Sequence, residues 1–99
     1  MRLPANKQDK WLNMLGESIR SRRMRLGMSQ IDLATTAGVH RTYISDIERG
    51  ARNVTVLTIH RIAIALRVCT AELFAYADQM AKDDLPKGED GRHEAPSCL

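Results

Sequence analysis

The 99 residues of this chain are enough for one small domain with a single hydrophobic core, and 15 Lys and Arg stand against 12 Asp and Glu. No apolar run approaches the roughly 20 residues of a membrane span, and the polar N-terminus lacks the apolar region of a secretion signal. Because Cys69 and Cys98 are too few for a disulfide framework, we expect reduced thiols and a cytoplasmic protein.

The N-terminal quarter divides into a polar arm and a helix. Residues 1–10 are polar and show no apolar period, so we expect a flexible arm. Apolar residues at a helical spacing, including Leu15 and Ile19, then predict a first helix over about residues 10–26. Arginines gather near its C-terminal end, where cations suit the negative end of the helix dipole.

Residues 30–52 contain two short helical patterns joined by a tight turn. Ser29 supplies a side-chain oxygen for the free amides of the first of these helices, and Asp32 places a carboxylate near the same helix start. The helix is expected to stop at Gly38, because a residue without a β-carbon takes the positive φ of a sharp turn easily.

The second helix of this pair is expected over about residues 41–49. It buries Ile44 and Ile47 on one face and turns a hydrogen-bonding face outward. The outward residues are Arg41, Thr42, Ser45, Asp46 and Arg49. Two short helices of this kind predict a helix-turn-helix, which places its second helix in the major groove of DNA.

Two further amphipathic helices are expected over about residues 56–67 and 71–81. Thr55 is the predicted N-cap of the first, and its core face begins at Val56. Further apolar residues make the apolar face of these helices wider than packing against one core requires. We therefore predict a dimer interface on the outer faces of both helices. Ordinary core packing is the alternative. The candidate interface residues are Leu57, Ile64, Phe74 and Tyr76.

The helical pattern ends after these helices. Residues 82–99 are polar, acidic and rich in glycine and proline, which is typical of a disordered tail. The sequence therefore predicts an all-α domain of five helices over residues 11–81, between a flexible arm and an acidic tail.

Positive charge is concentrated in the first half of the chain. Residues 1–54 hold ten Lys and Arg against five Asp and Glu, whereas residues 82–99 hold three against five. A basic excess around a helix-turn-helix favours a polyanionic partner, because neutralised phosphates release counterions. Chance scatter of surface charge is the alternative interpretation.

Several motifs resemble the signature of the Cro/CI (XRE) helix-turn-helix family. They are Ser29-Gln30, Leu33-Ala34, Ala37-Gly38-Val39, Tyr43-Ile44-Ser45, Ile47-Glu48-Arg49-Gly50 and Arg52-Asn53. The stretch from His40 to Gly50, followed by Arg52-Asn53-Val54-Thr55, is similar to the controller proteins of restriction-modification systems. The resemblance covers residues 15–74 and implies a Cro/CI-like fold.

The resemblance also implies an ion pair and an assembly. An arginine at the position of Arg23 commonly pairs, in this family, with the glutamate that matches Glu48; a phosphate contact by Arg23 is the alternative. Controller proteins are small dimers that act on their own promoter and on the endonuclease gene. We therefore expect a homodimer on a double-stranded DNA operator, with two dimers on adjacent sites as a further arrangement.

The chemistry of each outward side chain suggests its DNA contact. Arg41, Thr42 and Ser45 lie near the start of the recognition helix and are the candidates for reading bases. Of these, Arg41 matches guanine O6 and N7. The candidates for backbone contacts are Gln30, His40, Tyr43, Arg49, Arg52 and Asn53.

Some of these contacts keep alternatives. Tyr43 and Ser45 could each bond to a base or to a phosphate, and Arg49 and Arg52 could enter the minor groove. Asp46 is unusual beside a polyanion. It could orient a neighbouring arginine, Arg41 or Arg49, accept from cytosine N4, or be a solvated charge.

Other functions fit the sequence less well. The histidines and cysteines show no metal-ligand spacing, and no phosphate loop or nucleophile motif is present, so we expect neither an enzyme nor a cofactor. No small-molecule effector or membrane partner is expected. A phage-type repressor would carry nearly the same residues, and an antitoxin-like regulator would use the tail to bind another protein. Both remain alternatives.

Overall fold

The computed structural model describes residues 5–80, with side chains from residue 10 to residue 79. Its helices are α1 (Ala5–Arg25), α2 (Gln30–Ala37), α3 (Arg41–Glu48), α4 (Val56–Leu66) and α5 (Thr70–Met80). The prediction of a five-helix, all-α domain is therefore confirmed. The first four residues of the predicted arm and the predicted tail, residues 82–99, lie outside the described residues.

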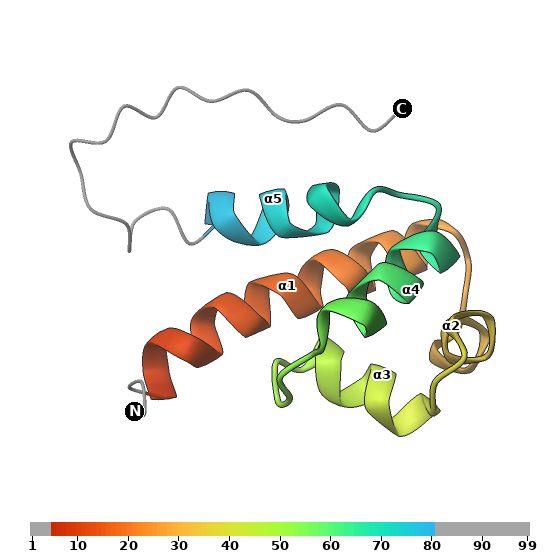
Figure 1. Ribbon diagram of the computed structural model, residues 1–99, viewed down its shortest axis with the longest axis horizontal. Helices are drawn as coiled ribbons and strands as arrows, with labels where there is room; N and C mark the ends of the chain where they lie inside the picture. The colour runs from red at the N-terminus through yellow and green to blue at the C-terminus, as the bar shows by residue number, and fades with distance from the viewer. Residues whose placement is uncertain (1–4, 81–99) are drawn as a thin grey trace.

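The longest helix, α1, is the support for the others. In Figure 1, α5 lies along one side of α1 and α3 lies on the opposite side, and both helices pack against it. The second helix, α2, packs against α3 and α4. This arrangement leaves α3 at the edge of the molecule farthest from α5 (Figure 1). None of the helices within residues 5–80 is both long enough and apolar enough to cross a bilayer.

Every helix contributes a fully buried aliphatic side chain to one core. Solvent exposure is 0% for the set Ile19, Leu33, Ile44, Ile62 and Leu73, which come from α1 to α5 in that order. Burying a side chain of this size contributes roughly 1.5–3 kcal/mol relative to leaving it exposed. The core therefore fixes α2 and α3 relative to α1, and with them the geometry of the helix-turn-helix.

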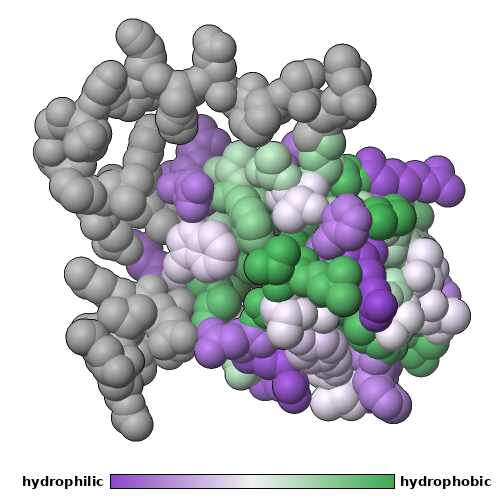
Figure 2. Space-filling model, in the orientation of Figure 1, coloured by the Kyte–Doolittle hydropathy of each residue, from purple (hydrophilic) through white to green (hydrophobic). Residues whose placement is uncertain are grey.

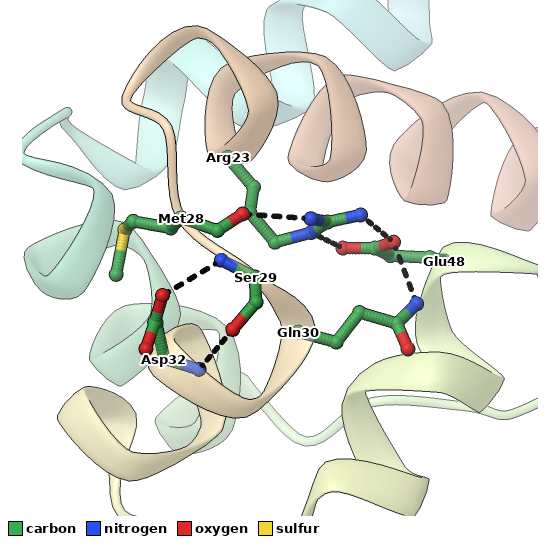
Figure 3. Close-up of polar contacts among 6 residues, drawn as sticks. All are labelled: Arg23, Met28, Ser29, Gln30, Asp32 and Glu48. Carbon is green, nitrogen blue, oxygen red and sulfur yellow. Dashed lines mark hydrogen bonds and ion pairs between the residues drawn. The ribbon is translucent and has the colours of Figure 1, made fainter.

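The predicted start and end of α2 are confirmed. The Asp32 backbone N–H donates to Ser29 Oγ at 3.0 Å, and the Ser29 backbone N–H donates to Asp32 Oδ2 at 2.9 Å (Figure 3). These bonds, first the one from the Ser29 backbone, hold the pKa of the Asp32 carboxyl below its usual value. Gly38 ends the helix with a φ of 78°. Both ends of α2 are thus set by its local sequence.

The first helix starts earlier than its apolar pattern predicts. It begins at Ala5, so residues 5–10 are helical where we expected a flexible arm. This stretch has no apolar period, but alanine, lysine and glutamine favour helix by intrinsic propensity. Apolar periodicity marks only the part of a helix that packs on a core, and it missed this extension.

The fourth helix begins with a residue that does not reach the core. The cap predicted at Thr55 is confirmed, since its Oγ1 accepts from the Thr58 backbone N–H at 3.1 Å. Val56 is 78% exposed, however, so the prediction that it begins the core face is wrong. The core face starts one turn later, at Ile59, which is 2% exposed. The first turn of α4 extends past the end of the core.

Cys69 lies directly before α5. Its backbone N–H donates to Glu72 Oε1 at 3.1 Å, which satisfies one of the amide groups near the helix start. Cys69 is disulfide-bonded, and no cysteine among the described residues is free, so the expectation of a reduced thiol is wrong here. The number of cysteines in a sequence does not show which side chains approach one another.

Candidate nucleic-acid interface

A close backbone contact joins the end of α3 to α1. Gly16 lies against the last carbonyl groups of α3, and a β-carbon added there would come within 2.6 Å of the Glu48 carbonyl oxygen. Gly50, directly after α3, lies against Asn13, whose Cα would be 2.9 Å from an added β-carbon. Real β-carbons do not come this close to other atoms. Because Gly16 and Gly50 carry no β-carbon, the end of α3 can lie directly against α1.

An ion pair makes a second connection between α1 and α3. Arg23 Nε donates to Glu48 Oε2 at 2.7 Å and Nη2 donates to Oε1 at 3.0 Å, a two-point contact (Figure 3). The side chains are 11% and 3% exposed. Arg23 Nη1 also donates to the Met28 carbonyl at 2.8 Å. The hydrogen bond to Glu48 raises the pKa of Arg23, so the guanidinium keeps its charge despite burial.

Gln30 belongs to the same network. Its Nε2 donates to Glu48 Oε1 at 3.1 Å, so the side-chain amide of this predicted DNA-backbone contact points toward the end of α3 (Figure 3). Gln30 is the first residue of α2, and its backbone N–H belongs to the first turn, where helix amides lack internal partners. In this arrangement the Gln30 side-chain amide is used within the protein, and the backbone N–H is the group at the start of α2 that faces the predicted contact.

The outer face of α3 is open to solvent at its N-terminal end. Arg41 and Thr42 are exposed, and Ser45 is half-buried. His40 occupies the N-cap position with an extended backbone, and its side chain makes no capping hydrogen bond. Because both side chains are exposed and α3 lies at an edge of the domain (Figure 1), Arg41 and Thr42 can reach a molecule placed along that edge.

Near the C-terminal end of α3, the carboxylate of Asp46 binds two arginines, Arg49 and Arg52. Arg49 Nη2 donates to Asp46 Oδ1 at 2.5 Å, and Arg52 donates to Oδ2 through Nη2 at 3.0 Å and Nε at 3.3 Å. The two bonds from Arg52, followed by the one from Arg49, hold the pKa of Asp46 below its usual value. The guanidinium of Arg52 also lies 4.8 Å from the centre of the Tyr43 ring.

A shallow, open hollow lies beside the start of α3. Its lining residues are Val39, His40, Thr42, Tyr43 and Arg52. Asn53 follows in the loop after α3 and is exposed. Within residues 5–80, no group of three or more His, Cys, Asp or Glu side chains could hold a metal ion. Four of the predicted contact residues, His40, Thr42, Tyr43 and Arg52, thus line one hollow beside the start of α3.

Comparison with known proteins assigns this arrangement to a family. A model of the helix-turn-helix family matches residues 19–74, more than half of the chain. The chain belongs to the XRE helix-turn-helix family. It is therefore a DNA-binding transcriptional regulator and not an enzyme.

Within the XRE family, this regulator is similar to restriction-modification controller proteins, as its motifs indicate. It is 44% identical over 64 residues to the control protein C.BamHI of Bacillus amyloliquefaciens, a match that covers 64% of this chain and 79% of the relative. The controller protein C.AhdI from Aeromonas hydrophila is 40% identical, with a TM-score of 0.63, over 64% of this chain and 96% of that one.

A third relative has been solved together with DNA. The controller protein C.Esp1396I, crystallised as a tetramer in complex with its natural 35 base-pair operator, is 33% identical to this chain with a TM-score of 0.65. The match covers 73% of this chain and 95% of that one. The shared fold therefore includes nearly all of a protein that was solved on its operator.

This XRE regulator also carries an exposed apolar surface on α4. Val56, Leu57 and Ile64 are 78%, 58% and 61% exposed. Figure 2 shows apolar surface gathered over α4, in the middle of the face toward the viewer. Of the two candidates on α5, Phe74 is half-buried with its ring centre 5.7 Å from that of Trp11, and Tyr76 is half-buried. The α4 residues are thus the more accessible part of the predicted interface.

Sequence reasoning missed one contact within this interface, the one between Asp46 and Arg52. Asp46 and Arg49 are three residues apart on a helix, so their contact was among the predicted alternatives for Asp46. The contact between Asp46 and Arg52 depends on the path of the loop after Gly50, for which no spacing rule exists. Neither of these contacts involves Arg41.

Proposed function

We propose that this regulator is a restriction-modification controller protein, a homodimer that binds a double-stranded DNA operator and controls its own promoter and an endonuclease gene. The observation that carries the proposal is the geometry of α3. Its N-terminal residues Arg41 and Thr42 are exposed at the edge of the domain, while Glu48 at its other end is bonded to α1. An exposed helix in a fixed orientation suits entry into a major groove.

Base reading by α3 would start with Arg41. A guanidinium bonded to guanine O6 and N7 contributes roughly 1–3 kcal/mol of discrimination against other bases. Thr42 would donate to a neighbouring base or place its methyl group on thymine, and Ser45 would reach a base from the next turn. These contacts supply the sequence preference, because contacts to the phosphates carry none directly.

Backbone contacts would hold α3 in register with the groove. The Gln30 backbone N–H lies at the positive end of α2, which attracts a phosphate. His40, Tyr43 and Arg52 line the hollow beside α3, and Arg49 and Asn53 are exposed at and after the end of that helix. Several cationic contacts of this kind should make binding fall steeply as salt rises.

A second copy of the chain would complete the reading surface. One helix-turn-helix covers only half of a two-fold-symmetric operator, so two recognition helices are needed about 34 Å apart. The exposed apolar residues Leu57 and Ile64 favour burial against another subunit. Because C.Esp1396I was solved as a tetramer on its operator, we extend the proposal to two dimers on adjacent sites. A regulator of this kind would act in the cytoplasm.

Footprinting on the DNA upstream of this regulator's own gene tests the proposal. We expect protection of a segment with two symmetric halves, at protein concentrations where unrelated DNA is unprotected. The same assay upstream of a neighbouring endonuclease gene tests the second part of the proposal. Uniform protection of all DNA, or none at any concentration, would contradict it.

A further inference from the structure

We propose that Asp46 is a positioning residue that restrains Arg49 and Arg52 and thereby limits sequence-independent binding to DNA. The inference rests on the proposed function, since it concerns how the α3 surface meets a duplex. In this proposal, an acidic residue on the DNA-binding surface contributes to sequence specificity.

The first observation is that a single carboxylate is shared by two cations. Asp46 Oδ1 accepts from Arg49 and Oδ2 accepts from Arg52, so both oxygens are occupied. The Asp46 side chain is 19% exposed, against 64% and 47% for the two arginines. The guanidinium groups thus extend toward solvent from an anchor that is itself mostly covered.

The second observation is that Arg52 is held from two directions. Its guanidinium is bonded to Asp46 and lies over the Tyr43 ring at 4.8 Å. Arg52 and Tyr43 also line the hollow that Thr42 borders at the start of α3. The position of Arg52 therefore shapes the surface beside a predicted base-reading residue.

Charge then determines which kind of binding Asp46 weakens. Sequence-independent binding depends mainly on how many phosphates the cations neutralise. A carboxylate on the binding surface repels the duplex and competes with phosphates for Arg49 and Arg52. Specific binding loses less affinity. Arginines that are held in one position meet the phosphates only when the protein lies in one register on the duplex, so they strengthen binding in that register alone. Asp46 should therefore widen the gap between specific and non-specific affinity.

The test compares the wild type with Asp46→Asn and Asp46→Ser on a fluorescent pool of random-sequence duplexes of 35 base pairs, the operator length of C.Esp1396I. Both variants should bind the pool about three- to tenfold more tightly near 0.1 M salt, with a log–log salt slope steeper by about 1 to 2. Glu17→Gln is the matched control, since it removes one exposed carboxylate from α1. Glu17→Gln should change the affinity for the pool and the salt slope less than the Asp46 variants do.

Sequencing of the bound duplexes measures specificity in the same experiment. Asp46→Asn should enrich preferred sequences less than the wild type, whereas Asp46→Glu, which keeps the charge, should retain most of the enrichment. Adding Arg52→Gln to Asp46→Asn should reverse most of the gain on the random pool, because the released arginine is then absent. This reversal would not follow from a purely structural role of Asp46.

Two results would overturn the inference about Asp46. One is unchanged affinity, salt slope and enrichment in both charge-removing variants, and the other is a loss of binding to the random pool. Failure of the proposed function would look different, because the wild type itself would then enrich no sequence. That result would remove the basis of both proposals.

Discussion

The guanidinium of Arg23 and the carboxylate of Glu48 form a two-point ion pair between the end of α1 and the end of α3, with N–O distances of 2.7 and 3.0 Å. Glu48 also accepts from Gln30 at the start of α2, so one carboxylate connects three helices. The orientation of the recognition helix therefore depends on this buried contact as well as on the apolar core.

Glu48→Ala is predicted to destabilise the fold strongly. It would leave the Arg23 guanidinium, whose side chain is 11% exposed, without its anionic partner. Removing one member of a buried ion pair costs about 3–5 kcal/mol. Chemical denaturation followed by circular dichroism measures the loss.

The double variant Arg23→Met/Glu48→Leu separates the stranded charge from the loss of contact. Replacing a buried pair with apolar side chains of similar volume is often neutral, so the double variant should recover most of the stability. If the free energy of unfolding of Glu48→Ala lies within about 1 kcal/mol of the wild-type value, the ion pair is effectively solvated and the prediction is wrong.

Gly16→Ala is predicted to destabilise the protein by about 1–3 kcal/mol, the usual range for overpacking. The new β-carbon would meet the Glu48 carbonyl oxygen at 2.6 Å, and a backbone atom cannot rotate away. DNA binding should fall further than stability alone explains, because α3 must shift. Thermal melting and binding to random-sequence duplexes measure the two effects.

Gly27→Ala is a useful comparison for that substitution. Gly27 has a φ of +71° and no atom within 4 Å of an added β-carbon, so only backbone strain opposes the alanine. The expected cost is about 1–2 kcal/mol, with DNA affinity retained at temperatures where the protein is folded. Equal effects of both variants on DNA binding would argue against a contact-specific role for Gly16.

Ile64→Glu is predicted to convert the proposed dimer into a monomer. Ile64 is 61% exposed on α4, and a carboxylate buried at a subunit interface would lack a partner. Sedimentation equilibrium measures the mass. Ile31→Glu is the control, since Ile31 is 59% exposed on α2, a helix that carries none of the proposed interface residues. Identical masses for the wild type and Ile64→Glu would exclude this interface.

Acid should destabilise the protein partly through Asp32. Its pKa lies below the ordinary 3.8, so the folded state holds fewer protons than the unfolded chain in this region. The resulting stability is fully present above about pH 3.8 and is lost as the pH falls through the lower folded pKa. Asp32→Asn should therefore flatten the acid limb of a plot of melting temperature against pH. An acid limb identical to that of the wild type would refute this assignment.

Local chemistry explains which parts of the fold the sequence could predict. The ends of α2 follow from Ser29, Asp32 and Gly38, each of which acts within a few residues. The start of α1 was missed because residues 5–10 carry no apolar period to detect. Val56 was misplaced because helical spacing assigns a face but not the point where the core ends.

The candidate site was only partly predictable for a related reason. Exposure of Arg41 and Thr42 follows from the period of α3, since Ile44 and Ile47 define the buried face. The contact between Arg23 and Glu48, 25 residues apart, was available only from resemblance to the family. The contact of Arg52 with Asp46 and Tyr43 depends on a loop path that spacing does not encode.

Base reading by α3 is tested most directly by comparing Arg41→Ala with the wild type on an operator duplex and on random-sequence duplexes of the same length. Arg20→Ala, which removes an exposed arginine from α1, is the control. Arg41→Ala should lose about 1–3 kcal/mol of preference for the operator while its weak, salt-sensitive binding to random duplexes persists. An equal loss of affinity on both kinds of DNA would mean that Arg41 contacts only phosphate and that α3 does not read the sequence through it.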